Sequence, residues 1–223
     1  MAFILDGTTG IATVDGSVSA PSQRGQDTNS GISYAADTIK FSTNGVERMA
    51  ITNSGITGTG IGGGKILQVK QTVKTDTAST GSTTYADVFT VAITPSASTS
   101  EFLLIGDLKI GYSSYTAAVM WKFVRTVSSS DTDLFIGDAD GNRTRCTWGI
   151  EDTSDSANDA VYHIASTHGT FLDSPNTTSP ITYKVQWKAQ QATAYLNRTG
   201  DDSNGFAYPR AASSLTVMEY DPT

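Results

Sequence analysis

The sequence predicts an all-β protein, in which a short N-terminal stem is followed by an antiparallel β-sandwich head. Apolar and polar residues alternate along much of the chain, which is the period of a β-strand. Few windows carry apolar residues at helical spacing. Charged residues make up only 17% of the chain, while glycine (21 residues), serine and threonine are abundant. Because threonine is β-branched and packs well on a pleated surface, this composition also favours β-structure.

Residues 1–57 are expected to form the stem, because they contain short apolar segments separated by tight-turn signals. Asp-Gly and Asn-Gly pairs tolerate the positive φ angles of such turns. Each segment has too few large apolar side chains to close a core alone, so we expect the stem to need partner chains. The apolar segments and the turn residues that follow them are Phe3–Leu5 with Asp6–Gly7, Ala12–Val14 with Asp15–Gly16, Thr38–Phe41 with Asn44–Gly45, and Arg48–Ile51 with Asn53–Gly55.

Residues 58–64 are interpreted as a glycine-rich linker. The segment superficially resembles a glycine-rich phosphate loop. However, no lysine-serine pair stands in the required place and no helical pattern follows, so the linker interpretation is favoured.

Residues 65–223 are expected to form the head, a sandwich of about ten strands joined by polar connections. Such a pattern without helices predicts a jelly-roll, although strand count alone leaves an immunoglobulin-like sandwich open. The clearest alternation lies in 117–127 and 181–189. The other expected strands are 65–73, 85–93, 102–112, 133–137, 144–150, 161–166, 192–198 and 214–220.

Several segments resemble virion appendage proteins. Residues 38–56, with the preceding 21–34, resemble a segment common in tailed-phage fibre proteins, in which two short strands flank a Glu-Arg-Met stretch and end in a Ser-Gly turn. In the head, residues 66–77 resemble the first strand of the C-terminal domains of cyanophage fibre-like proteins. The segments that resemble the closing strands of those domains are 181–188, 193–198 and 215–220.

The resemblance implies a tail fibre or other virion appendage protein with a jelly-roll head similar to the complement-globular and tumour-necrosis-factor folds. It further implies a homotrimer, an N-terminal segment that attaches to other virion proteins of the tail, baseplate or capsid, and a head that meets a host surface glycan or protein. Because a long repetitive shaft is missing, a capsid-decorating or tail-adaptor role is an alternative. A glycan depolymerase is a third alternative.

The charge balance and the beginning of the chain limit the other function classes. The net charge is −7, which argues against nucleic-acid binding because phosphate contacts need clustered lysine and arginine. No apolar run has the length of a membrane span, and no signal peptide is recognisable at the start. We therefore expect synthesis in a host cytoplasm, a place on the virion, no membrane insertion and no cofactor.

Polar motifs in the head do not indicate catalysis or a metal site. Asp138–Asn142 contains calcium-type ligands, but the EF-hand order fails and a hairpin turn at Asp140–Gly141 explains the same residues. The acidic segment Asp152–Asp159 is interpreted as a solvated loop. His163 and His168 are the only histidines, and neither a nucleophile elbow nor a paired-histidine motif accompanies them. We expect a protein that is not an enzyme and holds no metal.

Aromatic residues give the most concrete expectation of a binding site. Trp121 and Trp187 lie on alternating apolar faces and are expected in the core. Aromatic residues in or beside loops, close to hydroxyl and carboxylate groups, suit stacking on sugar rings. The residues predicted to contact a ligand are Tyr112, Tyr115, Trp148 and Tyr208.

Overall fold

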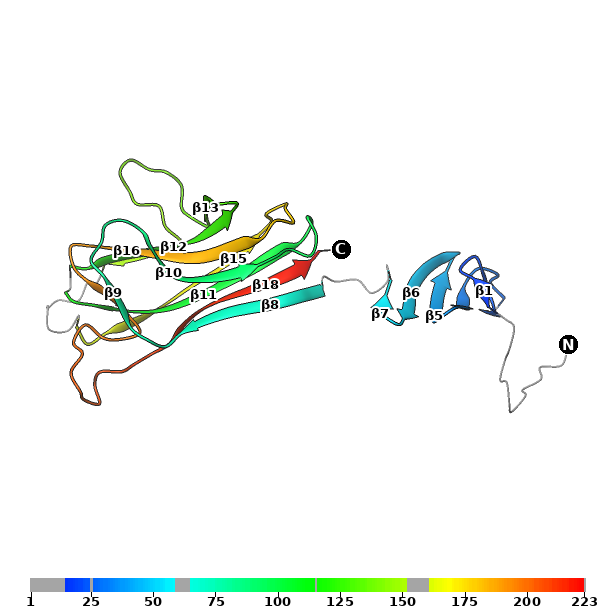
Figure 1. The fold of residues 1–223 in the computed structure, drawn as a ribbon, viewed down its shortest axis with the longest axis horizontal. Coiled ribbons are helices and arrows are strands. Elements are labelled where there is room, and N and C mark those ends of the chain that lie inside the picture. Colours follow the sequence, from blue (N-terminus) through cyan, green and yellow to red (C-terminus); the bar gives the residue numbers. More distant parts are fainter. Residues whose placement is uncertain (1–14, 25, 59–64, 115, 152–160, 223) are drawn as a thin grey trace. The chain divides into compact units, whose positions relative to one another are not determined.

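A computed structural model describes residues 15–24, 26–58, 65–114, 116–151 and 161–222, and the chain divides into two compact units, 1–63 and 64–222. All regular elements in the described ranges are β-strands, and every strand pair is antiparallel (Figure 1). None of the described segments is a helix that could cross a membrane. The expected linker lies outside the described residues except for Gly58, as do the expected stem strands before Asp15.

The N-terminal unit is a small meander. A two-strand hairpin, β1 (Gly16–Ser17) with β2 (Ala20–Pro21), precedes a five-stranded sheet with the order β3-β4-β5-β6-β7. Asn44 and Gly45, with φ angles of 52° and 72°, form the expected turn between the two longest strands. The sheet strands are β3 (Gln23–Arg24), β4 (Gly31–Ala35), β5 (Thr38–Thr43), β6 (Val46–Thr52) and β7 (Gly55–Thr57).

The head contains two sheets whose strand order is that of a jelly-roll. In one sheet, β18 lies between β8 and β11, and β15 pairs with the other side of β11. In the other sheet, β16 lies between β10 and β12. The first strand, β8, therefore pairs with the last, β18, and the next long strand, β10, pairs with the preceding long strand from the other end of the chain, β16, which distinguishes this fold from an immunoglobulin sandwich. The strands are β8 (Lys65–Lys74), β9 (Ala78–Thr80), β10 (Ala86–Ile93), β11 (Glu101–Tyr112), β12 (Ala118–Val127), β13 (Ser130–Leu134), β14 (Trp148–Glu151), β15 (Ile164–Asp173), β16 (Ile181–Gln190), β17 (Ala194–Leu196) and β18 (Ser213–Asp221).

The hydrophobic core of the described residues lies between the two sheets of the head. Trp121 and Trp187 are buried there, as expected from their place in the alternating pattern. Gly106 of β11 and Gly169 of β15 are directly paired, and a Cβ atom on Gly169 would lie 2.6 Å from the Trp121 ring. The glycine pair therefore makes the hollow that receives the aromatic rings of the opposite sheet.

Three expectations about the strands need correction. β15 extends to Asp173, well beyond the expected end at residue 166, because Ser166, Thr167 and His168 continue the ladder with β11 although they interrupt the apolar pattern. β9 was not expected. The turn at Asp140–Gly141 does not close a hairpin, because β13 and β14 both pair with β12 rather than with each other.

Candidate functional site

The N-terminal sheet has one apolar face that nothing in the described unit covers. Tyr34, Ile39, Ile51 and Ile56 are cross-strand partners in one row over four strands. Side chains that are direct partners point to the same side of a sheet. The three isoleucines of this row are each 38–56% exposed. A second row, Ile32, Phe41 and Met49, lies on the same face and is half-buried.

The opposite face of the same sheet carries the buried residues, and they are small. Ser33, Ser42 and Ala50 are each less than 5% exposed, and Ala50 is the one buried hydrophobic residue found in the described part of this unit. Lys40 and Glu47, which form a 3.0 Å ion pair, add charge to the unit. The large apolar side chains therefore face outward, and residues 15–24 and 26–58 bury no hydrophobic core of their own.

The head presents a second outward apolar surface on the sheet that contains β8, β18, β11 and β15. Val69, Met218, Leu103 and Leu172 form a cross-strand row on the outer face of this sheet. Val69 and Leu172, at the two ends of the row, are 52% and 48% exposed. A shallow depression of about 510 Å³ lies over this region and is lined by Ile66, Leu103, Leu172, Met218 and Tyr220.

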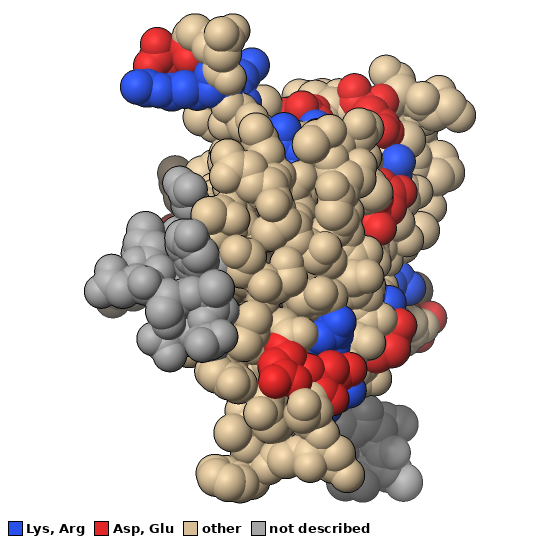
Figure 2. Space-filling view, turned by 90° about the vertical axis from the view of Figure 1, so that its left-hand side faces the viewer, with Lys and Arg blue, Asp and Glu red and all other residues tan. Residues whose placement is uncertain are grey.

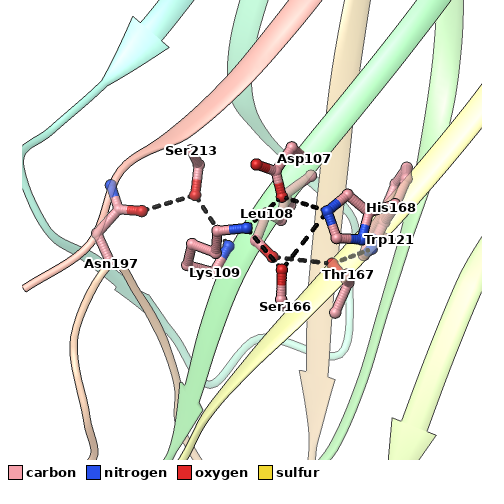
Figure 3. Close-up of polar contacts among 9 residues, drawn as sticks. All are labelled: Asp107, Leu108, Lys109, Trp121, Ser166, Thr167, His168, Asn197 and Ser213. Atoms are coloured by element: carbon pink, nitrogen blue, oxygen red, sulfur yellow. Dashed lines mark hydrogen bonds and ion pairs between the residues drawn. The ribbon is translucent and has the colours of Figure 1, made fainter. Parts of the chain in front are cut away.

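Further along the same outer face the side chains become polar (Figure 3). Lys109 is the centre of this group, because its Nζ lies 2.6 Å from both Asp107 Oδ1 and Ser166 Oγ. His168 Nε2 lies 3.1 Å from Asp107 Oδ1 and 3.5 Å from Ser166 Oγ. The outer face is therefore divided into two halves. The half near Lys65 and Asp221 is apolar, and the half around Lys109 is polar and charged.

The Ser166, His168 and Asp107 side chains do not have the arrangement of a catalytic triad. In a triad, the carboxylate accepts a hydrogen bond from one ring nitrogen and orients the imidazole, while the other ring nitrogen takes the proton of the nucleophilic hydroxyl. Here both oxygens approach the same nitrogen, Nε2, and Lys109 donates to the serine oxygen. These contacts suit an exposed polar surface.

Beside Lys109, where β17 and β18 both run along β11, Asn197 joins four chain segments. Its side-chain amide donates to the carbonyls of Lys74 and Asp76, and its Oδ1 accepts a 2.6 Å bond from Ser213 (Figure 3). Its backbone N–H donates to the carbonyl of Lys109. Because each of these polar groups has a partner, Asn197 fixes the loops at one end of the head.

That end of the head, opposite Lys65 and Asp221, will be called the far end. The described connections 75–77, 81–85, 113–114, 116–117 and 197–212 meet there, at the left of Figure 1. Figure 2 looks onto this end and shows an uncharged middle, with charged residues above it, along one side and in a cluster below it, and further uncharged atoms below that cluster. The far end is thus the part of the head at which loops offer mainly uncharged side chains.

The four aromatic residues predicted to contact a ligand have different surroundings. Tyr112 is 2% exposed and belongs to the core, so its prediction as a surface contact is wrong: it continues the inward alternation of Leu108 and Ile110. Tyr115 lies outside the described residues. Trp148 is half-buried and packs against the core. Ligand binding by Trp148 and Tyr208 stays a prediction.

Tyr208 lies at the far end beside two aromatic residues that the sequence interpretation did not select. Its ring lies 5.8 Å from that of Tyr162, at 51°. Phe206, two residues earlier, is fully exposed. Partial burial and the nearby Asp201 carboxylate raise the pKa of Tyr208. Hydrogen bonds from the hydroxyl and the backbone N–H of Ser203 lower the pKa of Asp201, which stays ionised at neutral pH.

Neither protein-family models nor curated proteins match the chain. Among solved structures it is similar to the infectious bursal disease virus VP2 subviral particle, with 11% identity and a TM-score of 0.32, over 71% of this chain and 43% of that one. The infectious bursal disease virus Gx strain gives 11% identity and a TM-score of 0.32, over 69% and 40%. The chain spans less than half the length of these proteins, and a likeness this distant has no bearing on function.

The acidic motifs give no support for a cation site in the described residues. Asp140 forms an ion pair with Arg143, and the backbone N–H of Arg143 closes a turn onto the Asp140 carbonyl. The segment Asp152–Asp159 lies outside the described residues. His163 is exposed. The surfaces that stand out are therefore the two apolar sheet faces and the aromatic far end.

Proposed function

We propose that this chain is a virion structural protein: a short homotrimeric tail fibre that attaches to the virion through residues 1–57 and recognises the host cell surface with its head. The alternative is a capsid-decorating or cement protein without receptor binding. The sequence resemblance of residues 38–56 to tailed-phage fibre proteins supports the virion assignment. The geometry supports the self-association on which a fibre depends.

The observation that carries the proposal is the uncovered row Tyr34, Ile39, Ile51 and Ile56. A sheet with one apolar face is stable when another layer covers that face. Fully burying an isoleucine contributes roughly 1.5–3 kcal/mol, and each of the three is about half exposed. Covering three isoleucines on each of several copies would therefore stabilise the assembly by several kcal/mol. An isolated N-terminal unit lacks this stabilisation.

A second copy of the same chain is a suitable cover for this face. Both rows of the face consist of apolar and aromatic residues, so two such faces can meet without opposing like charges, although the protein carries a net charge of −7. Closed rotational symmetry satisfies the same patch on every copy. The number three comes from the resemblance, because fibre heads of this type form trimers.

The outer apolar face of the head is a second surface for contacts between copies. Once stems hold the copies together, the heads are at high effective concentration, so that even weak contacts between the outer faces around Val69 and Met218 form. Three far ends then point at one target surface, and weak individual contacts add up to firm attachment. This arrangement uses surfaces rather than a catalytic centre, and we propose a protein without enzymatic activity.

The assembly is tested by mass photometry of the full chain at nanomolar to micromolar concentration. A species of three times the 23.5 kDa chain mass is expected, and a monomer at micromolar concentration would contradict the proposal. Labelled protein added to host cells then separates the two roles. Binding to cells supports a receptor-binding fibre, whereas binding only to virus particles that lack the protein supports the cement alternative.

A further inference from the structure

The far end of the head displays a phenylalanine that the fold leaves without cover. Residues 205–208 form a turn closed by the backbone N–H of Tyr208 and the carbonyl of Gly205, 3.1 Å apart. Phe206 is the second residue of this turn, and its relative exposure is 106%. Exposing a phenylalanine ring to water is unfavourable, so an exposed ring in the same turn as a second aromatic residue indicates a contact with something outside the chain.

Tyr208, the last residue of this turn, packs against Tyr162. Tyr208 and Tyr162 pack ring against ring at 5.8 Å, and Tyr162 keeps 43% of its surface exposed. Gly205 lies against the Tyr208 ring, because a Cβ atom there would come within 3.1 Å of Cε2. Two chain segments, residues 161–163 and 201–208, thus place three aromatic side chains at one end of the head. Packing of Tyr208 against Tyr162 and Gly205 reduces the entropy that these side chains would lose on binding.

The polar groups around these rings are mainly acceptors and hydroxyls. Ser203 donates to Asp201 through both its backbone N–H and its hydroxyl, which orients the carboxylate. Asp201 is an acidic group without an ion pair among the described residues, whereas Asp202 pairs with Arg210 at 2.7 Å and with Arg198 at 4.0 Å. Arg198 also donates to the carbonyls of Thr199 and Gly200.

We propose that Tyr162, Phe206 and Tyr208 form a binding site for a neutral glycan, a proposal that rests on the proposed role of the head in host recognition. Sugar rings present C–H faces that stack on aromatic rings, and their hydroxyls donate to carboxylates. An ionised Asp201 without a cationic partner repels uronates, sialic acids and phosphorylated sugars. Arg198 and Arg210 both pair with Asp202, and the two carboxylates and two guanidinium groups of this loop sum to no net charge, so the loop has no excess positive charge that would attract an anionic sugar.

The size of the site also favours a glycan over a protein ligand. A stable protein interface buries more than about 1,000 Å², far more than three aromatic side chains supply. Stacking of one or two sugar units gives a weak contact, typically in the millimolar range. A repetitive glycan met by several heads of one assembly raises that affinity by a factor of about 10² or more.

Binding of the full chain to immobilised polysaccharides tests the site. The neutral probes are laminarin, mannan and galactan, and the acidic probes are alginate and hyaluronan. Retention on at least one neutral polymer and on neither acidic polymer is expected. Phe206→Ala should lower retention at least tenfold, and Phe206→Leu should behave like the alanine variant because it lacks a π-face. Phe206→Trp should retain binding. Thermal melting of all three variants should be unchanged, since Phe206 makes no core contact.

Three outcomes overturn the inference: retention only on acidic polymers, retention that Phe206→Ala leaves unchanged, and no retention on neutral polymers by a chain that still binds host cells. The last outcome points to a protein receptor and leaves the proposed fibre function intact. If the chain binds neither polymers nor cells while it still assembles on virus particles, the host-recognition role fails together with the glycan site, and the cement alternative stands.

Discussion

The guanidinium of Arg125 holds the carboxylate of Asp173 with bonds of 2.6 and 2.9 Å inside the head. Arg125 belongs to β12 and Asp173 to β15, so the ion pair connects the two sheets. The Tyr183 hydroxyl donates a further 2.7 Å bond to the same carboxylate. Burial, followed by the Asp173 charge, raises the pKa of Tyr183, which therefore remains a neutral donor at all ordinary pH values.

Asp173→Asn should lower the free energy of unfolding by roughly 2–4 kcal/mol, because it leaves a largely buried guanidinium without its counter-charge. Urea unfolding followed by tryptophan fluorescence measures this loss. Asp131→Asn is the matched control: its ion pair with Lys184 is half exposed, and such pairs contribute less than about 1 kcal/mol. Equal losses in the two variants would contradict the assignment of Arg125 and Asp173 as the inter-sheet pair.

Glu219 makes the stability of the head dependent on acid. Burial raises the pKa of this carboxyl. Hydrogen bonds from Ser100, Ser96 and Gln68 together lower the pKa by more than burial raises it, so the pKa lies below the ordinary value of 4.5. A group with a lowered folded pKa stabilises the fold above its unfolded pKa and loses that contribution as pH falls through the folded value. Wild-type protein should therefore lose stability progressively below about pH 4.5.

Glu219→Gln provides the comparison for this pH dependence. At pH 7 the variant should be less stable by about 2 kcal/mol, because its amide nitrogen cannot accept the bonds that the carboxylate accepts. Below about pH 4.5 the gap between the two proteins should narrow. Denaturant midpoints recorded from pH 3 to 7 measure the gap, and a constant difference across this range would exclude Glu219 as the responsible group.

Gly169→Ala should destabilise the head by about 1–3 kcal/mol, because the added methyl would press on the Trp121, Thr147 and Phe123 side chains within 3.1 Å. Gly137→Ala meets nothing within 4 Å and serves as the control. Calorimetry of both variants gives the comparison. An unchanged melting temperature in Gly169→Ala would show that the two sheets can move apart at this point without lowering the free energy of unfolding.

Ile51→Lys should prevent self-association of the N-terminal unit, because it places a charge in the middle of the uncovered apolar row. The full chain should then shift toward the monomer mass in mass photometry. Asn53→Lys adds the same charge in the turn two residues later and should leave the assembly unchanged. An unaltered oligomer in Ile51→Lys would show that this face does not mediate assembly.

Met218→Lys tests the outer face of the head in the same way. Met218 is partnered by Val69 and Leu103 in the apolar row, so a lysine there should weaken contacts between heads while the core stays intact. Thr170→Lys, on the same face in the next row, is the control. Sedimentation velocity of the full chain over a concentration series detects the change, and equal behaviour of both variants would remove this row from the assembly interface.

The sequence predicted the all-β class and much of the core, because alternation is a local property. Val119, Trp121 and Phe123 on one strand, and Tyr183, Val185 and Trp187 on another, were readable as inward residues without knowledge of their neighbours. Pairing between distant strands is not local. The glycine pair Gly106–Gly169 and the contact of Arg125 with Asp173 depend on which strands become neighbours, and no spacing within either segment indicates that choice.

The candidate sites were predicted less well, for three physical reasons. Tyr112 was predicted to contact a ligand because it stands beside the turn at Ser113 and Ser114, although the alternation of Leu108 and Ile110 on the same strand continues through it into the core. Tyr162 gave no signal, because its importance comes from contact with Tyr208, 46 residues later in the chain. Phe206 lies within a polar loop, and only its exposure in the folded head distinguishes it from a residue that turns inward.

The position of β18 between β8 and β11 has a consequence for biosynthesis. β8 is the first strand of the head to leave the ribosome, yet its ladder partner, β18, is the last. At ordinary translation rates the two are separated by on the order of ten seconds. During that interval Ile66, Leu67 and Val69 form an unpaired edge strand in the nascent chain, which is the kind of segment that chaperones bind and that aggregates when they do not. Closure of the jelly-roll therefore waits until β18 has been synthesised, and the yield of folded head should depend on chaperone capacity in the producing cell.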